Sequence, residues 1–198
     1  MNTPKRKPTQ ERKSEIISAA FKLSAEMGPE GLTTEALAAK VGVSHGAIFR
    51  HFATKDAIWS AVFESISTKM EDAWRKVAPT PSPAGRLRLL VRAQLKLVTI
   101  IPALPAIIFS RELHKKNANI QKGVLALMKK FHGVLSKEIQ AAIDCGELQP
   151  DINATDTANL IIATMQGTVL RWSISQKKFD LVAEGEKMFS LILGCFHE

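Results

Sequence analysis

Apolar residues recur every three or four positions along most of this chain, which is the spacing of one face of an α-helix. Clusters of glycine, proline and serine interrupt the pattern. We therefore expect an all-α protein of about nine helices. Beyond residue 55 we predict helices at about 56–77, 86–101, a short one ending near 113, 119–145, 155–175 and 181–196.

The segment 32–55 is typical of two short helices joined by a tight turn. Thr33 and Thr34 are good N-cap residues, and Gly42 favours the left-handed conformation that ends a helix. Ser44 is placed to cap the second helix. Helical spacing gives both helices one buried side, made by Leu37, Ala38, Val41, Ala47, Ile48 and Phe52. The pattern predicts a helix-turn-helix.

The second helix of this motif carries residues suited to contact DNA. In a helix-turn-helix the N-terminal part of the second helix enters the major groove, while flanking residues hold the backbone. We predict that His45, Ala47 and Arg50 face base edges. Phosphate or sugar contacts are expected from Thr33 or Thr34, Phe49, His51 and Lys55. The full predicted DNA-binding set is Thr33, Thr34, Ser44, His45, Gly46, Ala47, Phe49, Arg50, His51 and Lys55.

Taken singly, each of these residues is also compatible with an ordinary solvated surface, and Phe49 with a core. The prediction therefore depends on the set at this spacing rather than on any one side chain. A non-DNA carrier or sensor of an apolar ligand is the alternative, and it leaves the cluster between Ser44 and Lys55 unexplained.

Further landmarks extend the motif in both directions. They are the apolar face of a first helix at Ile16, Ile17, Ala20 and Leu23, the stop at Gly28, the turn Gly42-Val43-Ser44, Gly46, the aromatic-x-His-Phe run from Phe49 to Phe52, and Thr54-Lys55. With them, the stretch 14–62, about a quarter of the chain, resembles the N-terminal domain of the TetR family of transcriptional regulators. Phe49 stands where this family most often has Tyr, which weakens that one phosphate contact. Ser24 stands where a core aromatic is common.

The resemblance implies a ligand-responsive, DNA-binding transcriptional regulator, most often a repressor, that binds a palindromic operator as a homodimer. It implies a helix-turn-helix domain at 1–57 and a ligand-binding and dimerisation domain at 58–198. From the basic residues near the start of the sequence, we expect a flexible arm at residues 1–10. In such proteins, ligand binding repositions the connecting helix so that the two heads no longer fit successive major grooves. No cofactor is implied.

The resemblance also places a ligand cavity among the central helices. Its predicted lining is Trp74, Leu97, Ile100, Phe109, Met128, Phe131, Met165 and Trp172, with Arg111, Glu112, His114, His132 and Arg171 as possible polar anchors. A stripe of aromatic residues and Met equally fits an ordinary core. The chain has no dense acidic cluster for a multivalent cation, so we expect a small, mostly apolar or amphipathic effector.

The last two predicted helices carry apolar residues on more than one face, which suggests burial against the body on one side and a partner on another. In proteins that resemble the TetR family, these helices pair with their copies in a second subunit. The predicted dimer interface is Ile161, Thr164, Gly167, Thr168, Arg171, Met188, Leu191, Ile192 and Cys195. Burial within a single subunit would give the same periodicity.

The net charge is compatible with a polyanionic partner but does not require one. The 198 residues carry a net charge of +8, and the pI of about 9.6 favours nucleic acid. Residues 1–57 hold nine Lys or Arg against six acids, and the excess lies within the first thirteen residues. Only Glu11 opposes the five basic residues there, Lys5, Arg6, Lys7, Arg12 and Lys13. Such a segment fits an arm that contacts DNA, and it fits a disordered tail equally well.

Several other classes of function lack their usual sequence signals. Cys145 and Cys195 are isolated, so we expect neither a metal site nor a disulfide. The apolar run 97–109 is broken by two prolines, and no secretory signal is visible, so we expect a cytoplasmic protein without a membrane partner. The sequence has no nucleophile elbow, metalloprotease motif or phosphate-binding glycine loop, and we expect no enzyme.

Overall fold

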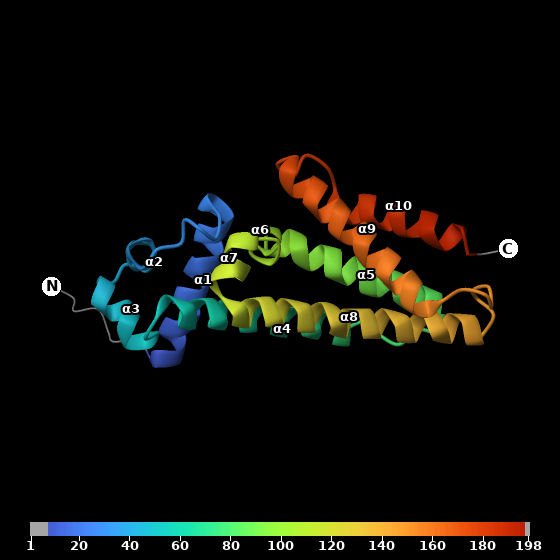
Figure 1. Ribbon diagram of the computed structural model, residues 1–198, viewed down its shortest axis with the longest axis horizontal. Coiled ribbons are helices and arrows are strands. Elements are labelled where there is room, and N and C mark those ends of the chain that lie inside the picture. The colour runs from blue at the N-terminus through green and yellow to red at the C-terminus, as the bar shows by residue number, and fades with distance from the viewer. Residues whose placement is uncertain (1–7, 197–198) are drawn as a thin grey trace. The chain divides into compact units, whose positions relative to one another are not determined.

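The computed structural model describes residues 8–196, and its regular elements there are all α-helices (Figure 1). They are α1 (Thr9–Met27), α2 (Thr34–Val41), α3 (His45–His51), α4 (Lys55–Arg75), α5 (Pro83–Ile100), α6 (Leu104–Ile108), α7 (Arg111–Lys116), α8 (Ala118–Asp144), α9 (Ala154–Ile174) and α10 (Leu181–Gly194). The all-α prediction is confirmed. The described residues form ten helices rather than about nine, because the predicted short helix ending near residue 113 is two helices.

Ser110 separates these two helices. It adopts an extended backbone, and its hydroxyl accepts a hydrogen bond from the Leu113 N–H at 3.0 Å, which caps the start of α7. The predicted helix ran through this position because periodicity does not register a single capping residue. Side-chain N-caps of the same kind begin α9 and α10, where Asn153 and Asp180 accept hydrogen bonds from first-turn N–H groups.

The chain divides into two compact units, each discontinuous in sequence. The first comprises the residues up to Ser67 together with Ala106–Gly123, and the second comprises Thr68–Pro105 and the residues from Val124 onward. The boundaries therefore fall within α4, α6 and α8.

The first unit holds α1, α2 and α3 around a small apolar core. The α1 helix packs against both α2 and α3, and α2 packs against α3. Side chains with no exposed area form the centre of this core: Ile16, Leu32, Leu37, Ile48 and Ile58. Because both short helices contribute only one or two buried side chains each, their fixed position depends on α1 and the start of α4.

In the second unit, α10 packs on α5 and on α9. Leu87, Leu90 and Leu95 of α5 are fully buried, as is nearly all of Phe189 on α10. The two backbones come close at Gly185, where a Cβ atom would lie 2.2 Å from Leu95 Cδ1. Only a residue without a side chain fits this approach.

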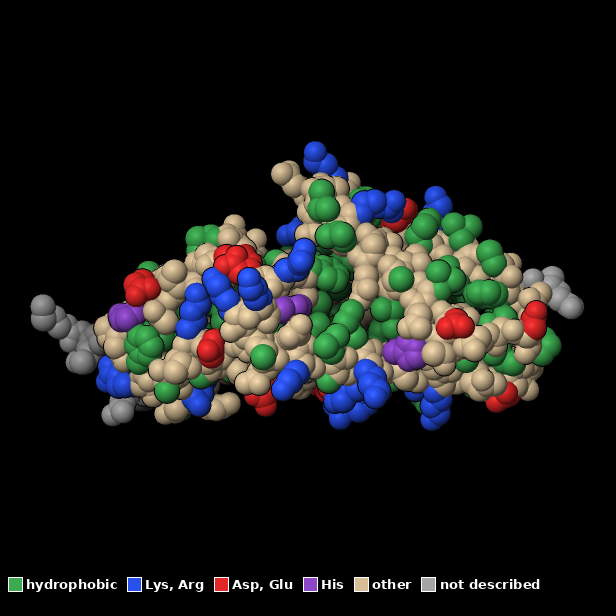
Figure 2. Space-filling view, viewed as in Figure 1, with side chains coloured by type: hydrophobic (Ala, Val, Ile, Leu, Met, Phe, Trp, Pro, Cys, Tyr) green, Lys and Arg blue, Asp and Glu red, His purple; other side chains and the backbone are tan. Residues whose placement is uncertain are grey.

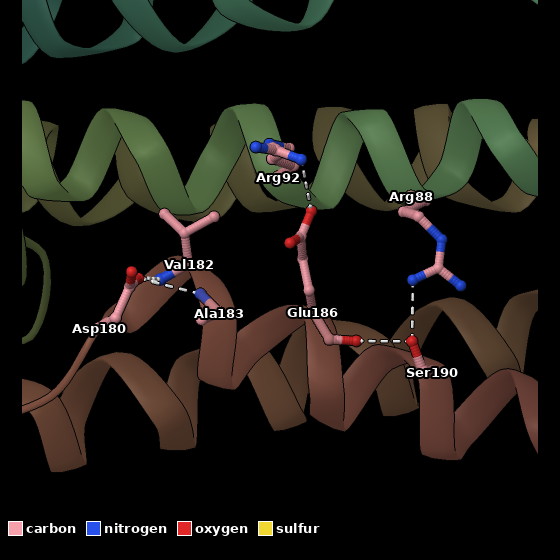
Figure 3. Close-up of polar contacts among 7 residues, drawn as sticks. All are labelled: Arg88, Arg92, Asp180, Val182, Ala183, Glu186 and Ser190. Atoms are coloured by element: carbon pink, nitrogen blue, oxygen red, sulfur yellow. Dashed lines mark hydrogen bonds and ion pairs between the residues drawn. The ribbon is translucent and has the colours of Figure 1, made fainter.

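Polar contacts hold the same two helices in register (Figure 3). Arg88 Nη1 on α5 donates to Ser190 Oγ on α10 at 2.8 Å, and Ser190 Oγ donates in turn to the Glu186 carbonyl. Arg92 Nη1 lies 3.3 Å from the Glu186 carboxylate. These exposed pairs add little stability individually, but they select one sliding position of α10 along α5.

The start of α5 is capped from a distant part of the chain. Ser82 accepts from the Gly85 N–H, and the Glu147 carboxylate accepts from both Ser82 Oγ and the Ala84 N–H, at 3.0 and 2.8 Å. A carboxylate at a helix N-terminus satisfies free donors and opposes the helix dipole favourably. The connection after α8 is thereby attached to the start of α5.

The predicted basic arm at residues 1–10 falls almost wholly outside the described residues. Arg12 and Lys13, which continue its run of positive charge, belong to α1 instead. Arg12 pairs with Glu15 at 2.7 Å, and Lys13 Nζ lies over the Phe52 ring at 5.4 Å. Over residues 8–196, no helix combines the length and apolar character required to cross a bilayer.

Candidate DNA interface

The turn between α2 and α3 is built as the sequence predicted. Thr33 is the N-cap of α2, and its hydroxyl accepts from the Ala36 N–H at 3.1 Å. Gly42 ends the helix in the left-handed conformation at φ 73° and ψ 41°, which strains any residue with a side chain. The Val43 N–H then bonds back to the Ala38 carbonyl at 3.0 Å. This closes the turn and sets the direction of α3.

One part of the predicted turn is wrong. Ser44 occupies the N-cap position of α3 with extended backbone, but its side chain makes no capping hydrogen bond. The Ala47 N–H bonds instead to the Ser44 backbone carbonyl at 2.9 Å. The serine hydroxyl lies at the exposed start of α3.

All ten residues of the predicted DNA-binding set are exposed or half-buried, and they come from the starts of α2 and α4 and from α3. Arg50 and Lys55 are exposed, whereas His51 is half-buried. Phe49 is 40% exposed and meets the His45 ring edge-on at 4.9 Å, so it lies outside the core. At Gly46, no atom lies within 4 Å of the position that a Cβ would take, so this part of α3 is open for close approach.

Lys55 is the first residue of the 21-residue helix α4. Thr54 caps that helix by accepting from the Ala57 N–H at 3.0 Å. The helix N-terminus and the lysine charge both favour an anion, which suits the predicted phosphate contact.

Three polar side chains join α2 to α3 at this surface. His45 Nε2 lies 2.9 Å from Thr34 Oγ1 and 3.0 Å from Glu35 Oε1. Thr34 Oγ1 also donates to Glu35 Oε2 at 3.4 Å. The pKa of the Glu35 carboxyl is lowered, chiefly by a hydrogen bond from its own backbone N–H. Burial opposes this shift, and Thr33, the His45 charge and Thr34 add to it. Glu35 was not among the predicted residues, because its partner lies ten positions away across the turn.

Two further hydrogen bonds within the first unit attach α7 and the start of α8 to Glu30 and Asp56. Ser110 Oγ donates to Glu30 Oε1 at 2.6 Å, and Asn117 Nδ2 donates to Asp56 Oδ1 at 3.2 Å. Asn117 also caps α8 by accepting from the Ile120 N–H. Each of these two capping side chains therefore also donates a hydrogen bond to a carboxylate. Ser110 donates to Glu30, which follows α1, and Asn117 donates to Asp56 of α4. Sequence alone has no signal for pairs separated by 61 and 80 positions.

We expect Ser110→Ala to destabilise the protein by about 1–2 kcal/mol at neutral pH, because α7 loses its cap and Glu30 loses a hydrogen bond. The pKa of Glu30 is lowered, first by the Ser110 hydroxyl and then by its own backbone N–H, with burial opposing and Lys116 helping. A lowered carboxyl pKa stabilises the fold above the ordinary Glu range, and this stabilisation is lost as the pH falls through the folded-state value. The difference between wild type and variant should therefore shrink in acid, as measured by urea unfolding across pH.

Glu30→Gln supplies the control for this prediction, since it removes the titrating group and keeps an acceptor for Ser110. In that background, Ser110→Ala should cost a similar amount at every pH. With Glu30 in place, a cost of Ser110→Ala that stays constant across pH would contradict the role of this pair.

The predicted cavity residues are distributed over both units. Phe109, Arg111, Glu112 and His114 belong to the first unit, and the others belong to the second. Trp74 and Phe131 are buried and stack on each other at 4.7 Å, and Trp74 Nε1 donates to Gln94 Oε1 at 2.7 Å.

The remaining predicted cavity residues range from buried to exposed. Met165 and Trp172 are buried, Leu97 and Met128 are half-buried, and Ile100 is 64% exposed. His114 Nε2 is buried and finds no hydrogen-bond partner within residues 8–196.

The first unit contains a hollow of about 120 Å³. Its lining combines apolar and charged side chains and includes the predicted DNA-binding residue Lys55: Pro29, Glu30, Lys55, Asp56, Trp59, Glu112, Leu113, Lys116 and Asn117. In the second unit, a gap of about 10 Å³ lies between α9 and α10, next to Met165 and Gly185. That gap holds at most one water molecule, so the contact between these two helices is tight.

The predicted dimer residues divide between the interior and the surface. Ile161 and Thr168 are buried within the subunit, beside Phe189 of α10. Gly167, Arg171, Leu191 and Cys195 are exposed, and Arg171 pairs with Glu184 at 2.6 Å.

Exposed apolar side chains that the prediction omitted extend this surface. Leu160, Leu170 and Ile174 of α9 are exposed, Ile174 by 74%. Figure 2 shows apolar side chains gathered over α9 and α10. We name the exposed residues Leu160, Leu170, Ile174 and Leu191 the α9–α10 apolar face.

In the part of the chain that the structure describes, no group of three His, Cys, Asp or Glu side chains could hold a metal ion. Cys145 and Cys195 are free and exposed.

Comparison with known proteins covers nearly the whole chain. The fatty acid metabolism regulator protein of Bacillus subtilis is 24% identical over 184 residues, which cover 92% of this chain and 94% of that protein. A TetR transcription regulator from Haloarcula marismortui superposes with a TM-score of 0.83 at 20% identity, covering 96% of this chain and 100% of that one. The regulator FadR from Bacillus subtilis, solved in complex with stearoyl-CoA, gives a TM-score of 0.78 at 23% identity, covering 93% and 99%. These structures share the fold.

Two family descriptions match consecutive parts of the sequence. Residues 16–62 match the bacterial regulatory proteins of the tetR family, and residues 63–195 match the C-terminal region of YsiA-like proteins. The first match contains the turn at Gly42 and every exposed residue of the predicted DNA-binding set. The chain therefore belongs to the TetR family of bacterial regulatory proteins, which confirms the prediction of a ligand-responsive, DNA-binding transcriptional regulator.

Proposed function

We propose that this regulator is a homodimeric repressor that binds a palindromic operator and is released by a long-chain acyl-CoA. In this proposal, residues 1–57 bind DNA, and residues 58–198 bind the effector and form the dimer through α9 and α10. In this proposal the protein acts in the cytoplasm, where its DNA partner lies.

The observation that carries the DNA-binding part is the exposed polar surface made by α3 and the adjoining starts of α2 and α4. A helix as short as α3 buries little, yet it presents His45, Arg50 and His51 beside an open Gly46. These residue types pair with base edges and phosphates. An exposed helix start at Lys55 adds an anion site at the edge of the same surface.

We expect Lys55→Ala and Arg50→Ala to weaken DNA binding in different ways. If Lys55 contacts a phosphate, its loss weakens binding to all duplexes and lowers the slope of log K against log salt by about one unit. If Arg50 reads a base, its loss relaxes one base preference, with a cost of about 1–3 kcal/mol on the preferred sequence. Fluorescence anisotropy across salt concentrations, on the DNA flanking the gene and on random duplexes, measures both quantities.

Lys22→Ala supplies the control, because Lys22 is an exposed lysine of α1 outside the predicted DNA-binding set. It should leave the salt slope nearly unchanged. An equal loss on every sequence would make Arg50 a backbone contact. A wild-type protein without salt-dependent binding to any duplex would refute the DNA-binding proposal.

The effector proposal rests on likeness along the whole chain to regulators of fatty acid metabolism, one of them solved with stearoyl-CoA. It agrees with the sequence-based expectation of an amphipathic ligand, since an acyl-CoA joins a long apolar chain to a charged nucleotide. The predicted cavity residues Trp74, Leu97, Met128, Phe131 and Met165 offer the apolar surroundings that such a chain requires.

We expect stearoyl-CoA to raise the operator Kd about 5- to 150-fold, the range of a typical coupling free energy. Titration of the protein–DNA complex with stearoyl-CoA, octanoyl-CoA, free stearate and free CoA separates the contributions of chain and nucleotide. Release by stearoyl-CoA alone supports the proposal. Failure of every acyl-CoA to bind, with operator binding intact, would leave a repressor with a different effector.

A further inference from the structure

The contact between Glu35 and His45 defines which nitrogen of the histidine carries the proton. A carboxylate only accepts hydrogen bonds, so the nitrogen 3.0 Å from Glu35 Oε1 must be a donor. That nitrogen is Nε2, and Thr34 Oγ1 at 2.9 Å is a second acceptor for the same N–H. Thr34 can accept there because its own hydroxyl hydrogen points to Glu35 Oε2.

This arrangement assigns the remaining ring nitrogen. In a neutral imidazole with the proton on Nε2, Nδ1 is an acceptor. Nδ1 makes no hydrogen bond to the residues that the structure describes. About half of the side chain is exposed, and the edge-on contact with Phe49 limits rotation of the ring. When its imidazole is neutral, His45 therefore presents a single, oriented acceptor at the first residue of α3.

We propose that Glu35, together with Thr34, is a positioning residue for base recognition, which holds His45 in the tautomer that presents Nδ1 as an acceptor to the major groove. This inference rests on the proposed DNA-binding function and deepens it. An acceptor at this position pairs with an exocyclic amino group, N6 of adenine or N4 of cytosine. Guanine O6 and N7 and thymine O4 are acceptors as well, and they are disfavoured opposite Nδ1.

The negative charge of Glu35 lowers the affinity of the protein for DNA. Its carboxylate lies on the surface that approaches phosphates, so its charge weakens binding to every duplex. Its contact with His45 therefore acts on selectivity while its charge lowers affinity. These opposite effects distinguish a positioning role from simple support of the fold. If Glu35 only supported the fold, its loss would lower both DNA affinity and base selectivity.

The test uses the full-length chain and the variant Glu35→Gln. An amide presents both an acceptor and a donor to Nε2, so either tautomer of His45 is satisfied. Relative affinities for the four base pairs at each half-site position are measured by selection from a random duplex library at about pH 8. We expect preference for an amino-bearing base at one position in wild type, and a loss of that preference by about three- to tenfold in the variant. Affinity for random DNA should stay equal or rise.

Two controls isolate the contact. Glu26→Gln removes the same charge from the head at an exposed position that pairs with Lys40, at 2.8 Å, and it should leave base preference unchanged. In a His45→Ala background, Glu35→Gln should have no further effect on base preference, since the positioned ring is gone.

Each outcome is decisive. Base preference in Glu35→Gln identical to wild type, or a change that persists in the His45→Ala background, overturns the positioning role while leaving DNA binding in place. A wild-type chain that binds no duplex overturns the proposed function and this inference together.

Discussion

Gly185→Val is expected to destabilise the protein by about 3 kcal/mol, because it forces side-chain atoms into a packed contact. Gly185 is buried where α10 crosses α5, and even a Cβ atom there would lie 2.2 Å from Leu95 Cδ1. Leu95 is itself fully buried, so it has little room to move. Urea unfolding at one fixed protein concentration measures the loss.

Gly133→Ala is the matched control, since this exposed glycine of α8 has nothing within 4 Å of the position that a Cβ would take. There the methyl group should stabilise the helix by about 0.5–1 kcal/mol. Leu95→Ala combined with Gly185→Val should cost less than the two single changes together, because the smaller side chain makes room for valine. Additive costs would mean that the strain lies elsewhere than at Leu95.

Leu191→Glu is expected to convert the proposed dimer to a monomer and to weaken operator binding by at least about 100-fold, since an unpaired charge buried in an interface costs about 3–5 kcal/mol. Leu191 is 58% exposed and belongs to the α9–α10 apolar face with Leu170 and Ile174. A palindrome needs two heads related by two-fold symmetry, so loss of the dimer removes half of the contacts. Sedimentation velocity over a range of concentrations measures the oligomeric state.

Leu125→Glu supplies the control for the dimer. Leu125 lies on α8, outside the predicted interface, and is 60% exposed, which nearly equals the value for Leu191. This variant should remain dimeric and bind the operator normally. If wild type sediments as a monomer at every concentration, the proposed interface is refuted.

The local architecture of the head was predictable because its signals are local. Thr33 caps α2, Gly42 ends it, and the apolar spacing of Leu37 and Ile48 selects the buried faces, all within a few residues. Ser44 shows the limit of such signals. A serine before a helix is suited to cap it, yet its side chain makes no such bond in this structure.

Helix boundaries in the body were predictable to within a few residues wherever proline or glycine interrupts the pattern. The exception is Ser110, where a single hydroxyl divides one predicted helix into α6 and α7. That hydroxyl also donates to Glu30, 80 positions away. Capping and long-range pairing therefore coincide in one residue, and apolar periodicity registers neither of them.

Apolar periodicity, caps and turn glycines were enough to establish an all-α chain with a helix-turn-helix and two double-faced terminal helices, because each depends on neighbours within one or two turns. Tertiary packing decided the rest. It buried Ile161 and Thr168 inside the subunit and left Leu170 and Ile174 exposed, because the rotation of α9 is set by its contacts with α5 and α10. It also brought Glu35 to His45 across the turn. The orientation of one helix against another depends on shape and hydrogen bonding between distant residues, and no pattern within a single helix contains that information.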